Sequence, residues 1–137
     1  MIKLIIGRKG SGKTKTLIEL VNSALVSSNG AVVCIEKGDK LKFDINHRCR
    51  LIDTEKYLID DAQSLFGFVA GILASNHDVT DIFIDSALKI CKNNAAQFDE
   101  FLNELSALLK SYDVNCVITS SIAAEEASAT VLKYVNH

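Results

Sequence analysis

The residues with the clearest chemistry lie near the N-terminus, in residues 7–14, which read GRKGSGKT. This segment fits the phosphate-loop pattern G-x-x-x-x-G-K-[ST] without a mismatch. Glycines allow positive φ angles and a close approach of backbone N–H groups to an anion. Lys13 is expected to reach the β- and γ-phosphates, and the Thr14 hydroxyl is expected to bind Mg²⁺. The segment therefore predicts a site for a nucleoside triphosphate.

The sequence on both sides of this motif gives it the context that such a loop needs. Residues 2–6 read as a short buried strand, and apolar residues at helical spacing follow between Leu17 and Leu25. The start of that helix would present unpaired N–H groups and the positive end of its dipole to the phosphates. The residues expected to contact the nucleotide here are Gly7, Arg8, Lys9, Gly10, Ser11, Gly12, Lys13, Thr14 and Thr16.

A second chemical group follows a later apolar run. Asp85 comes directly after Ile82, Phe83 and Ile84, at the predicted carboxyl end of a strand. Ligands of open α/β sheets bind beyond the carboxyl ends of the strands, where the motif at residues 7–14 would also lie. Asp85 is therefore predicted to hold Mg²⁺ together with Thr14, although an acidic residue at this place could also simply cap the next helix.

The hydrophobic pattern alternates strands with helices. Capping-box patterns at 60–63 and 94–97 predict the starts of two helices. This alternation predicts one three-layer α/β/α domain over residues 1–137, with a mostly parallel sheet covered on both faces. Residues 38–48 fit either a functional loop or a short edge hairpin through 41–44. Strands are expected at 2–6, 31–35, 49–53, 81–85 and 115–119, with a terminal edge strand at 129–135.

Composition narrows the classes of function. The net charge of −2 provides no general basic surface, so nucleic acid binding is not indicated. The four cysteines are widely spaced and are predicted to be free thiols, with Cys34 and Cys116 as small core residues. No signal peptide and no membrane-spanning run are evident, and a cytoplasmic location is expected.

Three places in the chain together resemble the RecA-like branch of the P-loop ATPases: the motif at residues 7–14, the strand end at Glu36, and the strand that ends at Asp85. The resemblance implies Mg²⁺-dependent ATP hydrolysis, with Lys13 and Glu36 as the catalytic residues and Glu36 polarising the attacking water. It also implies a polar residue that senses the γ-phosphate, at Thr119, Ser120 or Ser121. The implied order of strands is 49–53, 31–35, 81–85, 115–119 and 2–6, with the tail strand beyond.

The sequence also departs from that family, and other functions remain open. Ser86 follows Asp85 where many ATPases have Glu, and Arg48 or Arg50 lies either in a solvated loop or in reach of a neighbouring copy. The signatures of a GTPase are missing, which favours ATP over GTP. The alternatives are a small-molecule kinase and a non-catalytic nucleotide-binding module that regulates a larger assembly. Association with further copies or with a larger ATPase assembly is also expected from the resemblance.

Overall fold

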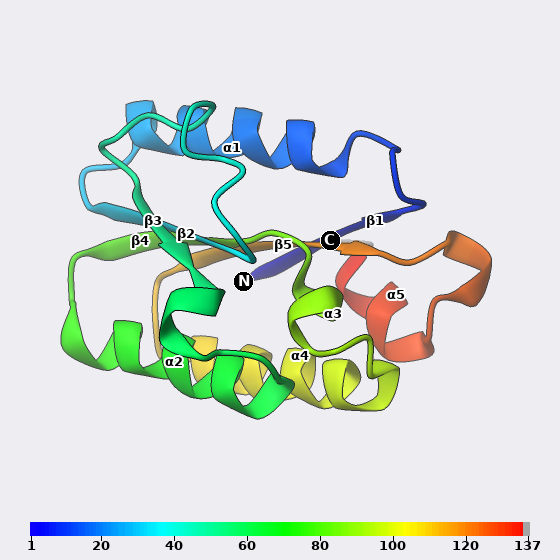
Figure 1. Ribbon diagram of the computed structural model, residues 1–137. Coiled ribbons are helices and arrows are strands. Elements are labelled where there is room, and N and C mark those ends of the chain that lie inside the picture. Colours follow the sequence, from blue (N-terminus) through cyan, green and yellow to red (C-terminus); the bar gives the residue numbers. More distant parts are fainter. Residues whose placement is uncertain (136–137) are drawn as a thin grey trace.

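The computed structural model describes residues 1–135, and within them the chain forms one five-stranded parallel sheet with helices on both faces (Figure 1). The strands are β1 (Ile2–Gly7), β2 (Ala31–Glu36), β3 (Arg50–Asp53), β4 (Val79–Ile84) and β5 (Asn115–Ser121). The helices are α1 (Lys13–Ser27), α2 (Ala62–Ser75), α3 (Ala87–Ile90), α4 (Ala95–Leu109) and α5 (Ala129–Val135). Short 3-10 helices cover Thr54–Tyr57 and Ala124–Glu126.

The strands lie in the order β1-β5-β4-β2-β3, and each neighbouring pair is parallel. This is the order predicted for the first five strands. β5 therefore separates β1 from β4, and β2 lies beside β4. Because all strands run in the same direction, their carboxyl ends meet at one edge of the sheet, where a ligand site is expected.

The two faces of the sheet are covered differently. Figure 1 shows α1 on one face and α2, α4 and α5 on the other. The larger core lies under α2 and α4 and includes the fully buried Phe98, Phe101 and Leu102. On the α1 face, the loop between β2 and β3 adds buried Leu41 and Ile45 to the core under the helix. This loop contains no strand, so the alternative of an edge hairpin through 41–44 is wrong.

The predicted terminal edge strand at 129–135 is also wrong, because this segment forms α5. The Ser128 hydroxyl accepts a hydrogen bond from the backbone N–H of Val131 at 3.0 Å, which caps the start of the helix. Val131 and Tyr134 lie three positions apart and are both buried in the larger core. Burial of these two side chains at helical spacing thus outweighs the strand preference of the β-branched residues in this segment.

The two predicted helix starts are confirmed, but the capping box of α2 is formed by Asp61 and Ser64, one residue later than the predicted pattern at 60–63. The carboxylate of Asp61 accepts a hydrogen bond from the backbone N–H of Ser64 at 2.7 Å, and Ser64 completes a capping box at the start of α2. The side chain of Asn94 accepts from the backbone N–H of Gln97 at 3.0 Å at the start of α4. These caps stabilise the two helices that cover the larger core.

The cysteines are buried free thiols, as predicted. Burial raises the pKa of Cys49 to about 11 and the pKa of Cys91 and Cys116 to about 12. Buried thiols of this kind are small apolar core residues with little nucleophilic character.

No helix within residues 1–135 has the length and apolar character needed to cross a membrane.

Glycine positions give a direct test of this packing. A Cβ at Gly30 would collide with the carbonyl oxygen of Asp78, whereas one at Gly67, on the exposed side of α2, meets nothing within 4 Å. We expect Gly30→Ala to lower the free energy of unfolding by about 1–3 kcal/mol because backbone must move. The control Gly67→Ala should raise it by up to about 1 kcal/mol, since alanine favours a helix. Equal effects in urea titrations would contradict this packing.

Candidate functional site

The motif loop (residues 7–14) turns from β1 directly into the first turn of α1. Gly10 and Gly12 have φ angles of 84° and 90°, which side chains other than glycine adopt rarely. Gly12 is the N-cap of α1, and no side chain caps this helix. The first N–H groups of an α-helix have no partner inside the helix, so the start of α1 is open to an anion.

Lys13 folds back over the motif loop. Its ammonium donates to the carbonyl oxygen of Arg8 at 2.9 Å and to Oγ of Ser11 at 3.4 Å. These contacts place a cation beside the uncapped start of α1, where helix dipole and ammonium both favour negative charge. Lys13 therefore lies beside the start of α1, and its predicted contact with phosphates stays a prediction.

Thr14 and Asp85 are brought together from opposite parts of the chain. The Thr14 hydroxyl lies 3.2 and 3.4 Å from the two carboxylate oxygens of Asp85 and donates to them. Asp85 is only 8% exposed, and Oδ1 also accepts from the Thr119 hydroxyl at 2.7 Å. The two residues that the sequence assigned to one metal site thus share a hydrogen bond.

Thr119 and Ser120 have a different place from the one that the resemblance implied. Both are buried, at 1% and 0% exposure. The Thr119 hydroxyl accepts from the backbone N–H of Ser86 at 2.9 Å, and the Ser120 hydroxyl accepts from the N–H of Leu88 at 3.3 Å. These side chains hold the segment after β4 in place. Of the three candidates for a γ-phosphate sensor, Ser121 is the one that lines the adjoining cavity.

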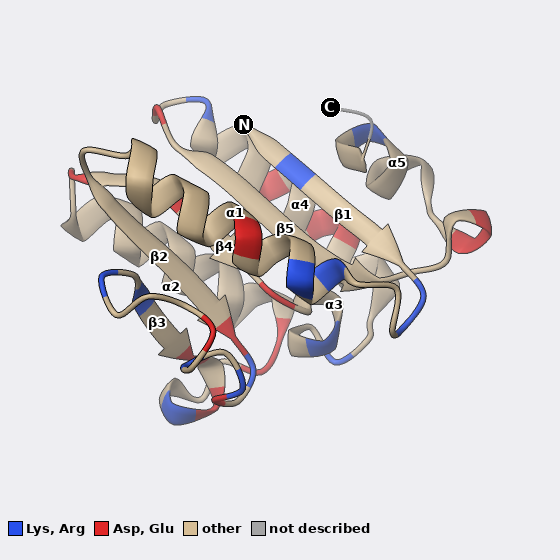
Figure 2. Cartoon of the chain, turned by 90° about the horizontal axis from the view of Figure 1, so that it is seen from above, with Lys and Arg blue, Asp and Glu red and all other residues tan. Residues whose placement is uncertain are grey.

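A cavity of about 690 Å³ lies between the motif loop and α3. Five lysines line it, and among the described residues no Asp or Glu does. Figure 2 shows basic segments in the loop before α1, at the start of α1 and in α3. An excess of cations without matching carboxylates favours a strongly anionic ligand. The cavity is lined by Lys9, Gly10, Gly12, Lys13, Thr14, Lys15, Lys40, Ser86, Leu88, Lys89, Asn93 and Ser121.

The far wall of this cavity is formed by a segment with unusual backbone conformation. Ser86, Lys92 and Asn93 all have φ angles of 57°, and they are three of the four non-glycine residues with positive φ in residues 1–135. Such conformations cost free energy and persist where surrounding contacts enforce them, often at functional sites. This conformation was not predicted from the sequence. Asn93 belongs to a residue type that adopts positive φ more often than most, whereas Ser86 and Lys92 give no such signal.

Glu36 reaches the same edge of the sheet but does not line the cavity. It is 3% exposed, and its two carboxylate oxygens accept from the backbone N–H groups of Lys40 at 3.1 Å and Leu41 at 3.3 Å. Burial raises the pKa of Glu36, with smaller contributions from the charges of Asp85 and Asp53. The backbone hydrogen bonds act in the opposite direction. In this structure the carboxylate holds the turn after β2.

Two other predicted contacts point elsewhere. The Arg8 guanidinium forms an exposed ion pair with Glu125 and does not line the cavity. The Thr16 hydroxyl donates to the carbonyl oxygen of Gly12 at 3.1 Å, which secures the first turn of α1. Both side chains therefore support the motif loop from outside the cavity.

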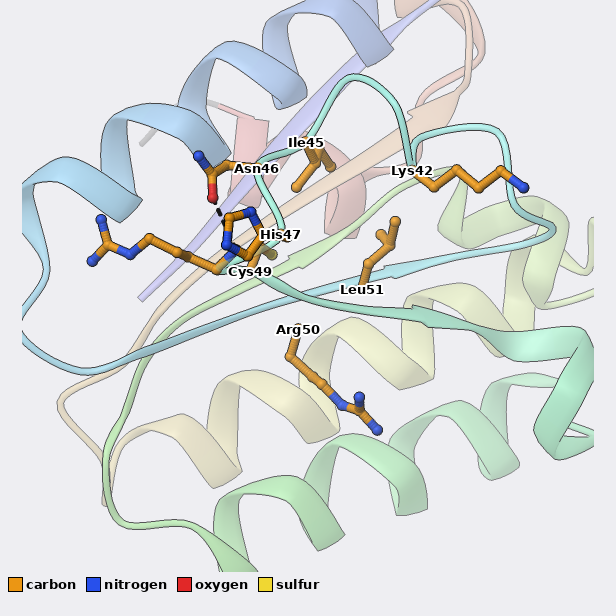
Figure 3. A pocket seen from close by; sticks show the side chains of 8 residues that line it. Lys42, Ile45, Asn46, His47, Cys49, Arg50 and Leu51 are labelled. Atoms are coloured by element: carbon orange, nitrogen blue, oxygen red, sulfur yellow. Dashed lines mark hydrogen bonds between the residues drawn. The ribbon is translucent and has the colours of Figure 1, made fainter.

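A second hollow, of about 390 Å³, lies along residues 42–51. In Figure 3 the side chains of Lys42 and Arg50 extend in different directions, with His47 between them in the chain. Arg48 and Arg50 are both exposed. Because Lys42 and Arg50 point apart, their charges do not converge on one ligand position in this hollow.

No protein-family model matches the chain, and no curated protein shows significant similarity to it. Within residues 1–135, no group of three or more His, Cys, Asp or Glu side chains is placed to hold a metal by itself. Thr14 and Asp85 would therefore supply only part of a metal's ligands. That arrangement suits Mg²⁺, which usually keeps several waters and binds substrate phosphates with one or two carboxylates.

The role of Thr119 as a support for Asp85 can be measured. We expect Thr119→Val to lower the free energy of unfolding by about 1–3 kcal/mol, because Asp85 loses its shortest hydrogen bond and the N–H of Ser86 loses its acceptor. The control is Ser121→Ala on the same strand, whose exposed hydroxyl should contribute less than about 0.5 kcal/mol. Similar urea midpoints for Thr119→Val and the wild type would disprove this role.

Proposed function

We propose that this chain is a RecA-like nucleotide-binding domain that binds ATP with Mg²⁺ at the motif loop and hydrolyses it. The observation that carries this proposal is the hydrogen bond between Thr14 and Asp85. One residue ends the phosphate-loop motif and the other follows a central strand, 71 positions away in the chain. A plain strand-to-helix turn has no need to bring these two oxygen-bearing side chains together.

The charge of the cavity supports a polyphosphate as the ligand. Lysines approach from the motif loop, from the turn after β2 and from α3. The uncapped start of α1 adds partial positive charge in the same region. Phosphoryl transfer depends mainly on positioning and on neutralising negative charge, and these groups supply both.

Thr14 and Asp85 are the residues that would hold Mg²⁺. Both offer oxygen ligands, which this hard cation prefers. The ion would neutralise charge on the phosphate oxygens when it is bound. Asp85 lies in a buried position with hydrogen bonds from Thr14 and Thr119, so its carboxylate is held in a fixed orientation before any ligand arrives.

The strand order supports the RecA-like part of the proposal. β5 lies between β1, which leads into the motif loop, and β4, which leads to Asp85. β2, which ends at Glu36, lies directly beside β4. This is the arrangement that the resemblance implied.

Nucleotide binding is tested by thermal unfolding with and without Mg²⁺-ATP. A ligand that binds only the folded state adds about 2.7 kcal/mol of stability when its concentration is about 100-fold above Kd. We expect Lys13→Ala to abolish this increase. Lys110→Ala, an equal change of charge at the exposed C-terminal end of α4, should retain it. A loss in both variants, or in neither, would contradict a specific role of Lys13.

Two roles for Glu36 give different kinetic results. As the base implied by the resemblance, Glu36→Gln would lower phosphate release and leave the Kd for Mg²⁺-ATP unchanged. The contacts favour the second role, in which Glu36 holds the turn that carries Lys40. Glutamine offers one acceptor oxygen instead of two, so we expect the Kd to rise several-fold. Equilibrium binding and single-turnover phosphate release on the same variant separate the two roles.

The phosphotransferase alternative has one observation in its favour. The cavity continues from the motif loop to Ser86, Leu88 and Asn93, which leaves room beside a phosphate chain. A kinase would form little ADP from ATP until an acceptor is added, and it would then transfer the phosphoryl group to that acceptor without releasing inorganic phosphate. A non-catalytic module would bind nucleotide and form neither ADP nor inorganic phosphate, with or without an acceptor. Measuring both ADP and inorganic phosphate formed by the wild type, with and without candidate acceptors, distinguishes the three functions.

A further inference from the structure

Two of the five lysines that line the cavity lie outside both the phosphate-loop motif and helix α1, which follows it. Lys40 follows β2 and Lys89 belongs to α3, which follows β4. Their neighbours Lys37 and Lys92 are also exposed but do not line the cavity, and Lys92 pairs with Asp60 at 3.6 Å. Lys40 and Lys89 therefore face the cavity while neighbouring lysines of the same segments do not.

The sheet order places these two lysines across from the motif loop. From β1 to β2 the sheet crosses β5 and β4, so three strand spacings separate the motif loop from the turn with Lys40. At about 4.8 Å per spacing this distance is roughly 14 Å. Asp85, which accepts a hydrogen bond from Thr14 of the motif loop, lies between the loop and this turn because it follows β4. A phosphate chain that begins on the motif loop and passes Asp85 meets Lys40 and Lys89 last.

Buried contacts fix the turn that carries Lys40. The Glu36 carboxylate accepts from the N–H of Lys40, and Oδ1 of Asp53 accepts from the N–H of Gly38 at 2.8 Å. Gly38 has a φ of 97°, which only glycine adopts easily. Two carboxylates and a glycine thus hold this turn in one conformation. Within residues 1–135, the side chain of Lys40 itself makes no hydrogen bond or ion pair, so it is available for a ligand.

The segment that carries Lys89 is held in a similar way, by side chains of β5. The buried hydroxyls of Thr119 and Ser120 accept from the N–H groups of Ser86 and Leu88. Ser86 keeps a left-handed conformation at the start of α3. Such a conformation persists because surrounding contacts enforce it, and here they direct α3 toward the cavity.

We propose that Lys40 and Lys89 bind the terminal phosphate of the ligand and make the site prefer a triphosphate to a diphosphate. This inference rests on the proposed function, because it assumes that the motif loop holds the preceding phosphates. The two lysines supply, within one chain, cationic contacts at the end of the phosphate chain. A lysine ammonium is a compact point charge on a flexible stem, which suits contact with phosphate oxygens.

The test compares ligands that differ by one phosphate. Titration calorimetry with the Mg²⁺ complexes of ATP and ADP gives the preference of each protein for the triphosphate. Inorganic tripolyphosphate and pyrophosphate serve as probes that lack the nucleoside. The variants are Lys40→Ala and Lys89→Ala, with Lys37→Ala and Lys92→Ala as controls of equal charge on the same segments.

We expect each of Lys40→Ala and Lys89→Ala to weaken ATP and tripolyphosphate binding about tenfold and to leave ADP and pyrophosphate binding unchanged. The two controls should bind all four ligands like the wild type. Equal losses for the longer and shorter ligands, or no loss at all, would overturn the inference.

Failure of the inference is distinguishable from failure of the proposed function. If Lys13→Ala abolishes ATP binding while Lys40→Ala and Lys89→Ala bind like the wild type, only the inference is wrong. If the wild type binds tripolyphosphate through Lys40 and Lys89 but does not bind ATP, the nucleotide proposal is wrong and the phosphate contacts stand. If the wild type binds none of the four ligands, both are wrong.

Discussion

The buried carboxylate of Asp85 is the group on which the rest of the site depends. Its oxygens accept hydrogen bonds from Thr14 in α1 and Thr119 in β5, and its backbone N–H donates to the carbonyl oxygen of Ile35 in β2 at 2.9 Å. A buried charge is costly unless it is hydrogen-bonded, so these partners stabilise the fold and also orient the carboxylate. One side chain thus joins the helix after the motif loop to the centre of the sheet.

The same carboxylate explains why the proposed ligands are a cation and an anion together. Asp85 lies beside a cavity lined by lysines, where a polyphosphate would be attracted. Phosphate oxygens next to a bare carboxylate would repel it, and a divalent cation held by Asp85 and Thr14 would remove that repulsion. The metal and the phosphate chain are therefore expected to bind together, each improving the site for the other.

Much of this arrangement could be predicted from the sequence, because it follows from local pattern and from the geometry of parallel sheets. The motif loop and the meeting of Thr14 with Asp85 are of this kind. The conformation of residues 129–135 was not predicted, since its strand-forming residues become helical through the cap at Ser128 and through burial in the core. The orientation of Glu36 follows from hydrogen bonds with the next turn, and the segment of Lys89 is held by hydrogen bonds to distant side chains of β5. Residue types give no signal for either arrangement.

The most direct test of the central claim is titration calorimetry of the wild type with ATP, once with Mg²⁺ and once with a chelator. Joint binding of metal and phosphates predicts saturable binding of one ATP per chain that weakens at least about tenfold when Mg²⁺ is removed. Equal affinity in both conditions would contradict the role of Thr14 and Asp85 as a metal site. The absence of saturable binding at millimolar ATP would contradict nucleotide binding itself.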